Sequence, residues 1–315
     1  LYFYILSFII YQKYTIMFTP ELGIRIGTLV SGANHPVSYI RQILPHGFES
    51  FELTWWRTLG DTDLTQLATE LRELLSGTGA VISSLGIYGN PLEEGPEDEE
   101  TRVGWEQLIR HAHLFGTDVV CGFTGRMRNQ PIEASLPKFN QVFSPLANLA
   151  EDFGVRLAFE NCAMDGTWHT GDWNIAHHPE HWERMFNAVK NENLGLEWEP
   201  CHQMIALLDP VPQIRQWSNR IFHVHGKCAT IRKDVLATHG IHGTVPFAFH
   251  RTPGFGDCNW HDVITELRLG GFEGSIDIEG WHDPVYKDML EMTGQVRSLN
   301  YLKTCRGGDY ISNPL

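Results

Sequence analysis

Runs of residues typical of buried β-strands alternate with amphipathic helical patterns along this chain, and the alternation repeats eight times. The predicted strands are Gly23–Leu29, Ser50–Trp55, Val81–Ile87, Asp118–Phe123, Arg156–Glu160, Leu194–Glu199, Ile221–His225 and Ser275–Glu279. The predicted helices are Val37–Leu44, Leu64–Leu75, Val103–Phe115, Leu136–Phe153, Pro179–Val189, Val211–Trp217, Trp260–Leu269 and Val285–Leu302. Because consecutive βα units close a parallel sheet on itself, the pattern predicts an α/β fold that forms a single (β/α)8 TIM barrel.

The same pattern predicts how the chain is divided. We expect one barrel domain over residues 17–305 and a C-terminal tail over residues 306–315. The segment 226–259 is too long for an ordinary loop and has no clear period, so it is predicted to be a lid over the barrel mouth. Residues 89–100 form a second irregular stretch, and its acidic run is interpreted as a solvated helix entry.

The first sixteen residues are strongly apolar. They lack a basic start and a small-residue cleavage site, and they are too few to span a bilayer. We interpret residues 1–16 as a non-native or flexible extension that precedes an ordinary start at Met17. The alternative is an apolar arm that packs on the barrel or on a partner.

Charge and cysteine content narrow the class of protein. The net charge is −14, from 38 acidic and 24 basic residues. A surface of that sign repels phosphate backbones and anionic lipid, which argues against a nucleic-acid or membrane partner. The six cysteines form no C-x-x-C pair, which predicts reduced thiols and a cytoplasmic location.

Four of the predicted strands end on a side chain that can bind a metal ion: Glu160, Glu199, His225 and Glu279. The C-terminal ends of barrel strands converge on one mouth, so these groups can share one cation. A single glutamate there can be solvated, and a single histidine is often a satisfied core group. Together, however, several buried carboxylates require a neutralising charge.

The composition of this set bears on the identity of the metal. Hard divalent cations bind carboxylate oxygens, and one imidazole shifts the preference toward transition metals. We therefore predict one Mn²⁺ ion, with Mg²⁺ or Co²⁺ as alternatives. The absence of a thiolate from the set argues against a structural zinc.

Residues two positions apart on a strand point to the same face. If Glu199, His225 and Glu279 point into the barrel, a second polar layer lies below them, made of Glu197, His223 and Asp277 and joined by Glu52 and Arg25. This layer either orients the metal ligands or forms an internal ion-pair network.

Several short segments resemble the xylose-isomerase-like TIM barrels of the sugar phosphate isomerase/epimerase group, over about residues 17–302. The first is Glu160-Asn161-Cys162 with the tryptophan-containing segments that follow it. Glu199-Pro200-Cys201-His202 is similar to that family's D-P-S-H, and residues 223–227 are similar to its H-V-H-A-K. Residues 251–260 resemble its R-x-P-G-x-G-D-x-x-W loop, and Ile278-Glu279 its terminal I-E.

The resemblance implies metal ligation by Glu160, Glu199, His225 and Glu279. It also implies substrate contacts by His202 and by Arg251 of the lid. Two departures from the family pattern affect this inference: Glu199 stands where the family has Asp, and Cys228 where it has Asp after the lysine.

The resemblance also implies a reaction: metal-dependent isomerisation or epimerisation of a sugar by proton abstraction next to a carbonyl. Glu160 and Glu279 would transfer the proton, and His202 would bind the developing oxygen charge. The candidate substrate contacts are Lys227, Arg251, Trp168 and Glu52. Trp168 is included because indoles stack on the apolar faces of sugars.

Three other functions remain open. The first is a lyase that acts by β-elimination on a keto-sugar, of the inosose dehydratase or 3-keto C-glycoside type. The second is an apurinic endonuclease, which the negative charge opposes. The third is a non-catalytic sugar-binding barrel. We expect a homo-oligomer, or a complex with a small partner subunit, because many aromatic residues fall in the mouth loops.

Overall fold

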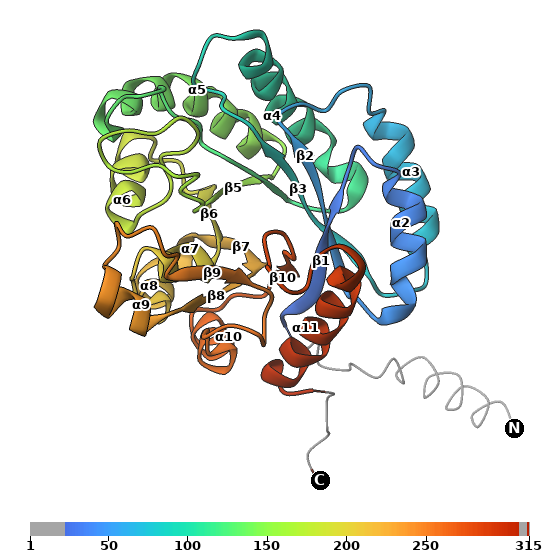
Figure 1. Cartoon of the computed structure of the whole chain (residues 1–315). Coiled ribbons are helices and arrows are strands. Elements are labelled where there is room, and N and C mark those ends of the chain that lie inside the picture. Colours follow the sequence, from blue (N-terminus) through green and yellow to red (C-terminus); the bar gives the residue numbers. More distant parts are fainter. Residues whose placement is uncertain (1–22, 309–313, 315) are drawn as a thin grey trace, which may run out of the picture.

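The computed structural model describes residues 23–308 and 314, and it is a closed barrel of eight parallel strands surrounded by helices (Figure 1). The barrel strands are β1 (Arg25–Ser31), β2 (Ser50–Trp56), β3 (Val81–Tyr88), β4 (Val119–Gly122), β5 (Arg156–Glu160), β6 (Leu194–Trp198), β7 (Ile221–Gly226) and β10 (Ser275–Ile278). Their order around the barrel is β1-β10-β7-β6-β5-β4-β3-β2. The predicted fold, a single (β/α)8 TIM barrel, is confirmed. The expectations for residues 1–16 lie outside the described residues.

The helices that follow the strands form the outer layer (Figure 1). They are α2 (Pro36–Ile43), α3 (Leu64–Leu75), α4 (Pro96–Phe115), α5 (Ile132–Asp152), α6 (Pro179–Ala188), α8 (Pro210–Trp217), α10 (Trp260–Leu269) and α11 (Glu291–Arg306). Short 3₁₀ turns occupy Leu44–His46, Ser218–Arg220 and Asp288–Leu290. None of the helices in the described part of the chain is both long enough and apolar enough to cross a bilayer.

The main hydrophobic core lies between the strands and this helical layer. Phe51, Leu53 and Trp55 of β2 belong to it, together with apolar residues of α3 and α4. The alternate residue Glu52 points the other way, into the barrel, where it contacts His225. The interior of the barrel around His225 is therefore polar, and the charges buried there must be paired.

Two helices begin more than five residues away from their predicted starts. Helix α4 begins at Pro96, seven residues before the predicted Val103, because the Asp98 carboxylate accepts a hydrogen bond from Gly95 N at 3.0 Å and so caps the start of the helix. The acidic run thus occupies the first helical turn, where the helix dipole favours negative charge. Helix α11 begins at Glu291 rather than Val285. Asp283 caps Val285 and Tyr286, as a helix cap would, but the turn does not continue as a helix.

The segment 226–259, which was predicted to be a lid, is more regular than its sequence suggests. Strands β8 (Cys228–Ile231) and β9 (Ala248–Arg251) form an antiparallel hairpin that encloses helix α9 (Lys233–His239). The end of the segment then packs closely on β8, since a Cβ at Gly256 would lie 2.5 Å from Cys228 Sγ. A further short helix, α7 (Pro200–Ile205), follows β6 at the mouth. Sequence periodicity did not predict β8, β9, α9 or α7, because each is too short to show a period.

Candidate metal centre and active site

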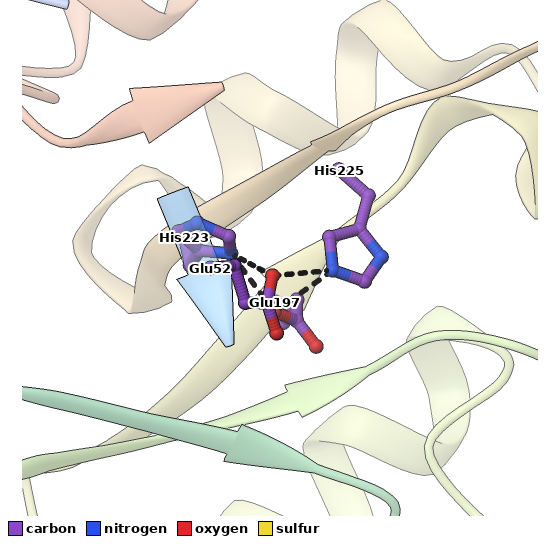
Figure 2. Close-up of side chains that lie close together, drawn as sticks. All are labelled: Glu52, Glu197, His223 and His225. Carbon is purple, nitrogen blue, oxygen red and sulfur yellow. Dashed lines mark hydrogen bonds and ion pairs between the residues drawn. The ribbon is translucent and has the colours of Figure 1, made fainter. Parts of the chain in front are cut away.

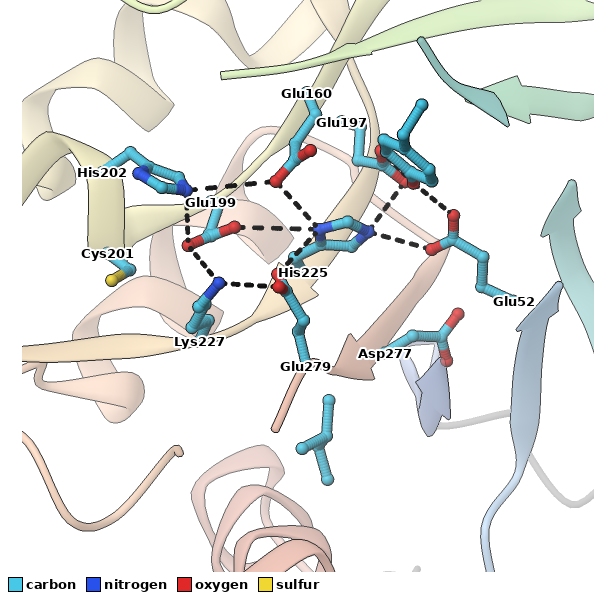
Figure 3. A network of polar contacts seen from close by, with 12 residues as sticks. Glu52, Glu160, Glu197, Glu199, Cys201, His202, His225, Lys227, Asp277 and Glu279 are labelled. Carbon is cyan, nitrogen blue, oxygen red and sulfur yellow. Dashed lines mark hydrogen bonds and ion pairs between the residues drawn. The ribbon is translucent and has the colours of Figure 1, made fainter. Parts of the chain in front are cut away.

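Four side chains meet at the C-terminal mouth of the barrel (Figure 3). Glu160 ends β5, Glu199 follows β6, His225 lies in β7 and Glu279 follows β10. Each contributes one ligand atom, and these atoms all lie within 4.8 Å of one another. Nδ1 of His225 lies 3.7 Å from Glu160, 3.7 Å from Glu199 and 3.4 Å from Glu279. These four residues are called the mouth cluster below.

The polar atoms of the mouth cluster are incompletely satisfied. Both carboxylate oxygens of Glu199, Oε2 of Glu279 and Nδ1 of His225 are buried, and none has a hydrogen-bond partner among the described residues. A buried polar atom left unpaired carries a desolvation cost of about 1–3 kcal/mol, more if charged. A divalent cation would satisfy all four atoms at once, and three carboxylates with one imidazole suit Mn²⁺, Mg²⁺ or Co²⁺. The residues present therefore fit a metal ion.

The carboxyl groups of the mouth cluster differ in their electrostatic surroundings. Burial raises the pKa of Glu160 and that of Glu199. Burial also opposes ionisation of Glu279, but the charges of Lys227 and His225 outweigh it and hold the pKa of Glu279 well below its usual range. Lys227 Nζ donates a hydrogen bond to Glu279 Oε1 at 2.6 Å and lies 3.9 Å from Glu199. Of the two mouth-cluster carboxyl groups that line the cavity, Glu160 and Glu279, Glu279 is therefore the more readily ionised.

A second polar layer lies directly below the mouth cluster (Figure 2). Nε2 of His225 lies 2.9 Å from Glu52 and 3.0 Å from Glu197. His223 lies 2.8 Å from Glu197 through Nδ1 and 2.8 Å from Asp277 through Nε2. These residues lie one layer deeper, as strand alternation predicts. Arg25, by contrast, lines a cavity at the opposite end of the barrel.

This lower layer fixes the orientation of His225. Its carboxylates accept from Nε2–H, which leaves Nδ1 as the atom that faces the mouth cluster. The Tyr88 hydroxyl lies 2.6 Å from Glu52 and 2.8 Å from Glu197 and holds those two carboxyls in place. Burial alone would lower the pKa of His225, yet Glu197 and Glu52 hold it well above its usual range. In the metal-free protein the imidazole therefore carries the charge that a cation would otherwise supply.

The substrate candidates fall in different places. His202 lies on α7, with Nε2 3.3 Å from Glu199 and 4.0 Å from Glu160, and it lines the mouth cavity. Burial lowers its pKa to about 4, so the imidazole is neutral at neutral pH. Trp168 also lines the cavity, below the guanidinium of Arg184 at 4.8 Å.

The other candidates have partners within the chain. Glu52 is fully buried below His225 and is absent from the lining of the cavity, so it acts on the site through that histidine. Lys227 lines the cavity floor but is hydrogen-bonded to Glu279. Arg251 is also absent from the cavity lining, and its Nε donates to Asp283 Oδ2 at 3.1 Å. A contact of Arg251 with substrate stays a prediction that requires the lid to move.

Two residues that sequence reasoning did not assign a role support the site. Asn161 spans Glu199, accepting from its backbone N–H at 2.6 Å and donating to its carbonyl at 2.9 Å. Tyr88 ends β3 and reaches the lower layer. The position of Tyr88 at a strand end was a usable signal, whereas the cross-strand bonds of Asn161 depend on the neighbouring strand and leave no local pattern.

The mouth cluster opens into a cavity of about 1350 Å³. Besides the cluster residues, tryptophan, phenylalanine and histidine side chains from the βα loops line it. A mouth cavity above polar groups that converge from several strands is the usual place for the active site of a barrel enzyme.

All six cysteines are free and buried.

Comparisons with known proteins agree with this architecture. A solved structure of 3-keto-D-glucoside 4-epimerase, YcjR, from E. coli is similar, with a TM-score of 0.65 and 16% identity, covering 90% of this chain and 100% of that one. A probable 3-DHS dehydratase, AsbF, from Bacillus anthracis gives a TM-score of 0.65 and 16% identity, covering 89% and 99%. At these identities the likeness concerns the fold.

Sequence comparison gives the family. The uncharacterized protein YfiH of Bacillus subtilis (strain 168) is 23% identical over 273 residues, which cover 74% of this chain and 84% of that protein. The family model described as xylose isomerase-like TIM barrel matches residues 40–305. The chain therefore belongs to the xylose isomerase-like TIM barrel family.

Proposed function

We propose that this protein is a divalent-metal-dependent sugar isomerase or epimerase that transfers a proton at the carbon next to a carbonyl. The observation that carries the proposal is the set of unpaired, buried ligand atoms on Glu199, His225 and Glu279. A cluster that served only stability would pair these atoms internally, as the lower layer does. The similar epimerase structure supports a reaction of this kind.

Glu160, Glu199, His225 and Glu279 would hold the metal ion. A divalent cation there would polarise a substrate carbonyl and lower the barrier to removal of the neighbouring proton. The protein supplies the proton-transfer groups, their protonation states and a cavity in which they act. His225 is held rigidly by Glu52 and Glu197, so the cluster keeps its arrangement while substrate enters and leaves.

Glu160 and Glu279 suit opposite proton-transfer roles. Glu279 stays ionised beside Lys227 and accepts the proton from the substrate carbon. Glu160, whose pKa burial raises, returns a proton to the other face of that carbon or to its neighbour. The first outcome is epimerisation and the second is isomerisation. In the reverse reaction the two residues exchange roles.

His202 is placed to bind the oxygen on which charge develops. It lines the cavity beside Glu199 and is neutral at neutral pH, so it can donate a hydrogen bond without carrying a formal charge. A donor fixed toward the developing charge stabilises the transition state more than the ground state. We assign His202 this role.

A second candidate is a lyase that eliminates a group from the carbon beyond the one that loses its proton. The similarity to a probable dehydratase favours it, because the fold-level likeness is as high as for the epimerase. The first step would be the same, and Glu160 would protonate the leaving group instead of a carbon. The two candidates differ only in where the second proton goes.

The test is a reaction of the Mn²⁺-loaded protein with a panel of ketoses, keto-glycosides and inososes in D₂O, followed by NMR. An epimerase or isomerase incorporates deuterium at a carbon of a product with unchanged composition. A lyase gives an unsaturated or cleaved product. Absence of both exchange and product over the whole panel, with metal bound, would oppose a proton-transfer function.

A further inference from the structure

The mouth cavity is larger than a single sugar ring needs. Its volume of about 1350 Å³ exceeds the roughly 300–1000 Å³ typical of sites for drug-sized ligands. The mouth cluster, Lys227 and His202 lie at its floor, so a sugar bound there occupies one part of it. The remaining volume is lined by aromatic and other side chains from the loops, and its chemistry indicates what else the cavity holds.

Four aromatic residues form a continuous wall on one side of the cavity. Trp56 ends β2, Tyr88 ends β3, Phe123 follows β4, and Trp173 comes from the loop between β5 and α6. The ring centroids of Trp56 and Trp173 are 5.5 Å apart, those of Trp56 and Phe123 6.3 Å, and those of Tyr88 and Phe123 5.3 Å. We call these four residues the aromatic wall. Three of its residues come from the ends of β2, β3 and β4, which are neighbours in the barrel, whereas the mouth cluster comes from β5, β6, β7 and β10 (Figure 1).

The aromatic wall is supported by an arginine and is partly exposed. The Arg57 guanidinium lies 4.7 Å from the ring of Trp173 and 5.5 Å from that of Trp56, and Glu97 fixes it at 2.7 Å. Trp56 nevertheless remains 54% exposed. A large aromatic ring that is rigidly supported and still open to a cavity presents a flat apolar face to a ligand.

Away from the mouth cluster, the described residues that line the cavity include no lysine or arginine that is free to bind an acidic group. Lys227 is the one lysine or arginine among the described residues that line it, and it is paired with Glu279 at 2.6 Å. Burial, the largest effect, lowers the pKa of His177 to about 3 and that of His181 to about 4, so these two lining histidines are neutral at pH 7. A phosphate or carboxylate held away from the mouth cluster would lose its water without a lysine or arginine to compensate.

We propose that the substrate is an uncharged keto-sugar that carries a second ring, and that this ring stacks on Trp56 and Trp173 while the sugar lies over the mouth cluster. The second ring is either another sugar or an aromatic group, because both present an apolar face to an indole. The placement of the first ring rests on the proposed function. The aromatic wall then acts as a specificity site for glycosides over free or phosphorylated sugars.

The test measures binding of compounds that have no keto group and are therefore not turned over. Isothermal titration of the Mn²⁺-loaded protein compares 4-nitrophenyl β-D-glucoside, cellobiose, methyl β-D-glucoside and glucose 6-phosphate. We expect at least one of the two compounds with a second ring to bind about tenfold or more tightly than methyl glucoside, which in turn binds no more weakly than the phosphate. Preference for the nitrophenyl compound identifies an aromatic second ring, and preference for cellobiose a sugar.

Two variants locate the second ring. Trp56→Ala should remove the preference and leave the affinity for methyl glucoside unchanged. Trp281→Ala is the matched control, because Trp281 is 48% exposed and lines the same cavity but follows β10, on the mouth-cluster side. This variant should keep the preference. Both positions are exposed, so folding is checked by thermal unfolding and is expected to be unchanged.

Three results would overturn this proposal. The first is equal affinity for methyl glucoside and both ring-bearing compounds, including no binding of any of them, and the second is tightest binding of glucose 6-phosphate. The third is loss of the preference in Trp281→Ala but not in Trp56→Ala. The binding measurement does not depend on turnover. A preference for a second ring without hydrogen exchange in D₂O would therefore support the binding role of the aromatic wall and contradict the isomerase function. Hydrogen exchange without such a preference would support the isomerase function and contradict the binding role of the wall.

Discussion

Nζ of Lys227 lies 2.6 Å from Oε1 of Glu279, and both side chains are buried at the floor of the mouth cavity (Figure 3). The ammonium keeps Glu279 ionised where burial alone would favour the neutral acid. Lys227 consequently sets the protonation state of a group that we assign to proton transfer. Its own pKa is held well above the usual range by Glu199 and Glu279, although burial opposes this.

Lys227→Met should raise the pKa of Glu279 and move the acid limb of the pH–activity profile to higher pH. Because Glu279 is the base only when ionised, turnover at pH 7 should fall by at least about tenfold if the substitution leaves most of the Glu279 carboxyl groups protonated at that pH. The measurement is kcat against pH. Lys287→Met makes the same change at an exposed position and should leave the profile unchanged. An unshifted profile in Lys227→Met would contradict the pairing.

Glu160→Gln and Glu279→Gln should each lower turnover by at least about a hundredfold, since general acid–base catalysis contributes about 10²–10⁴. Each change removes a proton-transfer group and weakens metal binding, so the assay is repeated with excess Mn²⁺. The matched control is Glu100→Gln, at an exposed position on α4. Exchange of substrate hydrogen with solvent at the normal rate in both variants would exclude the assignment.

Glu52→Gln tests the lower layer. Its carboxylate holds Nε2 of His225 at 2.9 Å and so presents Nδ1 to the mouth cluster. Loss of such a supporting group typically weakens metal affinity by about 10–100-fold. Mn²⁺ titration measures the effect, and Glu73→Gln on α3 serves as the exposed control. Unchanged affinity in Glu52→Gln would mean that this layer serves stability alone.

The convergence of the four mouth-cluster residues could be predicted because the fold itself brings them together. Each of Glu160, Glu199, His225 and Glu279 stands at the C-terminal end of a strand, and parallel strands in a barrel have their C-terminal ends at one mouth. The alternation of side chains along a strand likewise predicted the lower layer. These inferences need only the strand positions and the topology.

The partners of Lys227 and Arg251 could not be predicted in the same way. Both have long side chains that choose among several acceptors, and the choice depends on loop geometry. Lys227 extends inward to Glu279, while Arg251 lies in the lid hairpin and extends to Asp283, which also accepts from Thr252 N at 2.9 Å. The sequence contains these residues but not the hairpin that decides where they point.

We expect the free energy of unfolding to decrease at acid pH because His177 is buried in its neutral form. Burial lowers the pKa of His177 to about 3, against about 6.5 in the unfolded chain. Below pH 6.5 the unfolded state therefore binds a proton that the folded state does not. The stability contribution is complete above pH 6.5 and is lost as the pH falls toward 3, by about 2 kcal/mol at pH 5.

His177→Asn should remove that part of the pH dependence. Urea unfolding at pH 7 and at pH 5 measures the free energy of unfolding of the variant and of His113→Asn, an exposed control on α4. We expect the loss of stability between the two pH values to be smaller in His177→Asn and unchanged in the control. Equal losses in both variants would show that His177 does not titrate in this range.

The most direct test of the metal centre measures two quantities together: the number of Mn²⁺ ions that each chain binds and the number of protons that binding releases. His225 is protonated in the metal-free protein, and its Nδ1 must lose that proton to bind a metal ion. Calorimetric titration in buffers of different ionisation enthalpy should give about one ion per chain, release of at least one proton, and weaker binding as the pH falls. His225→Gln and Glu199→Gln should each abolish tight binding. Failure to bind any divalent ion, or unchanged binding in both variants, would contradict the claim that the mouth cluster is a metal centre.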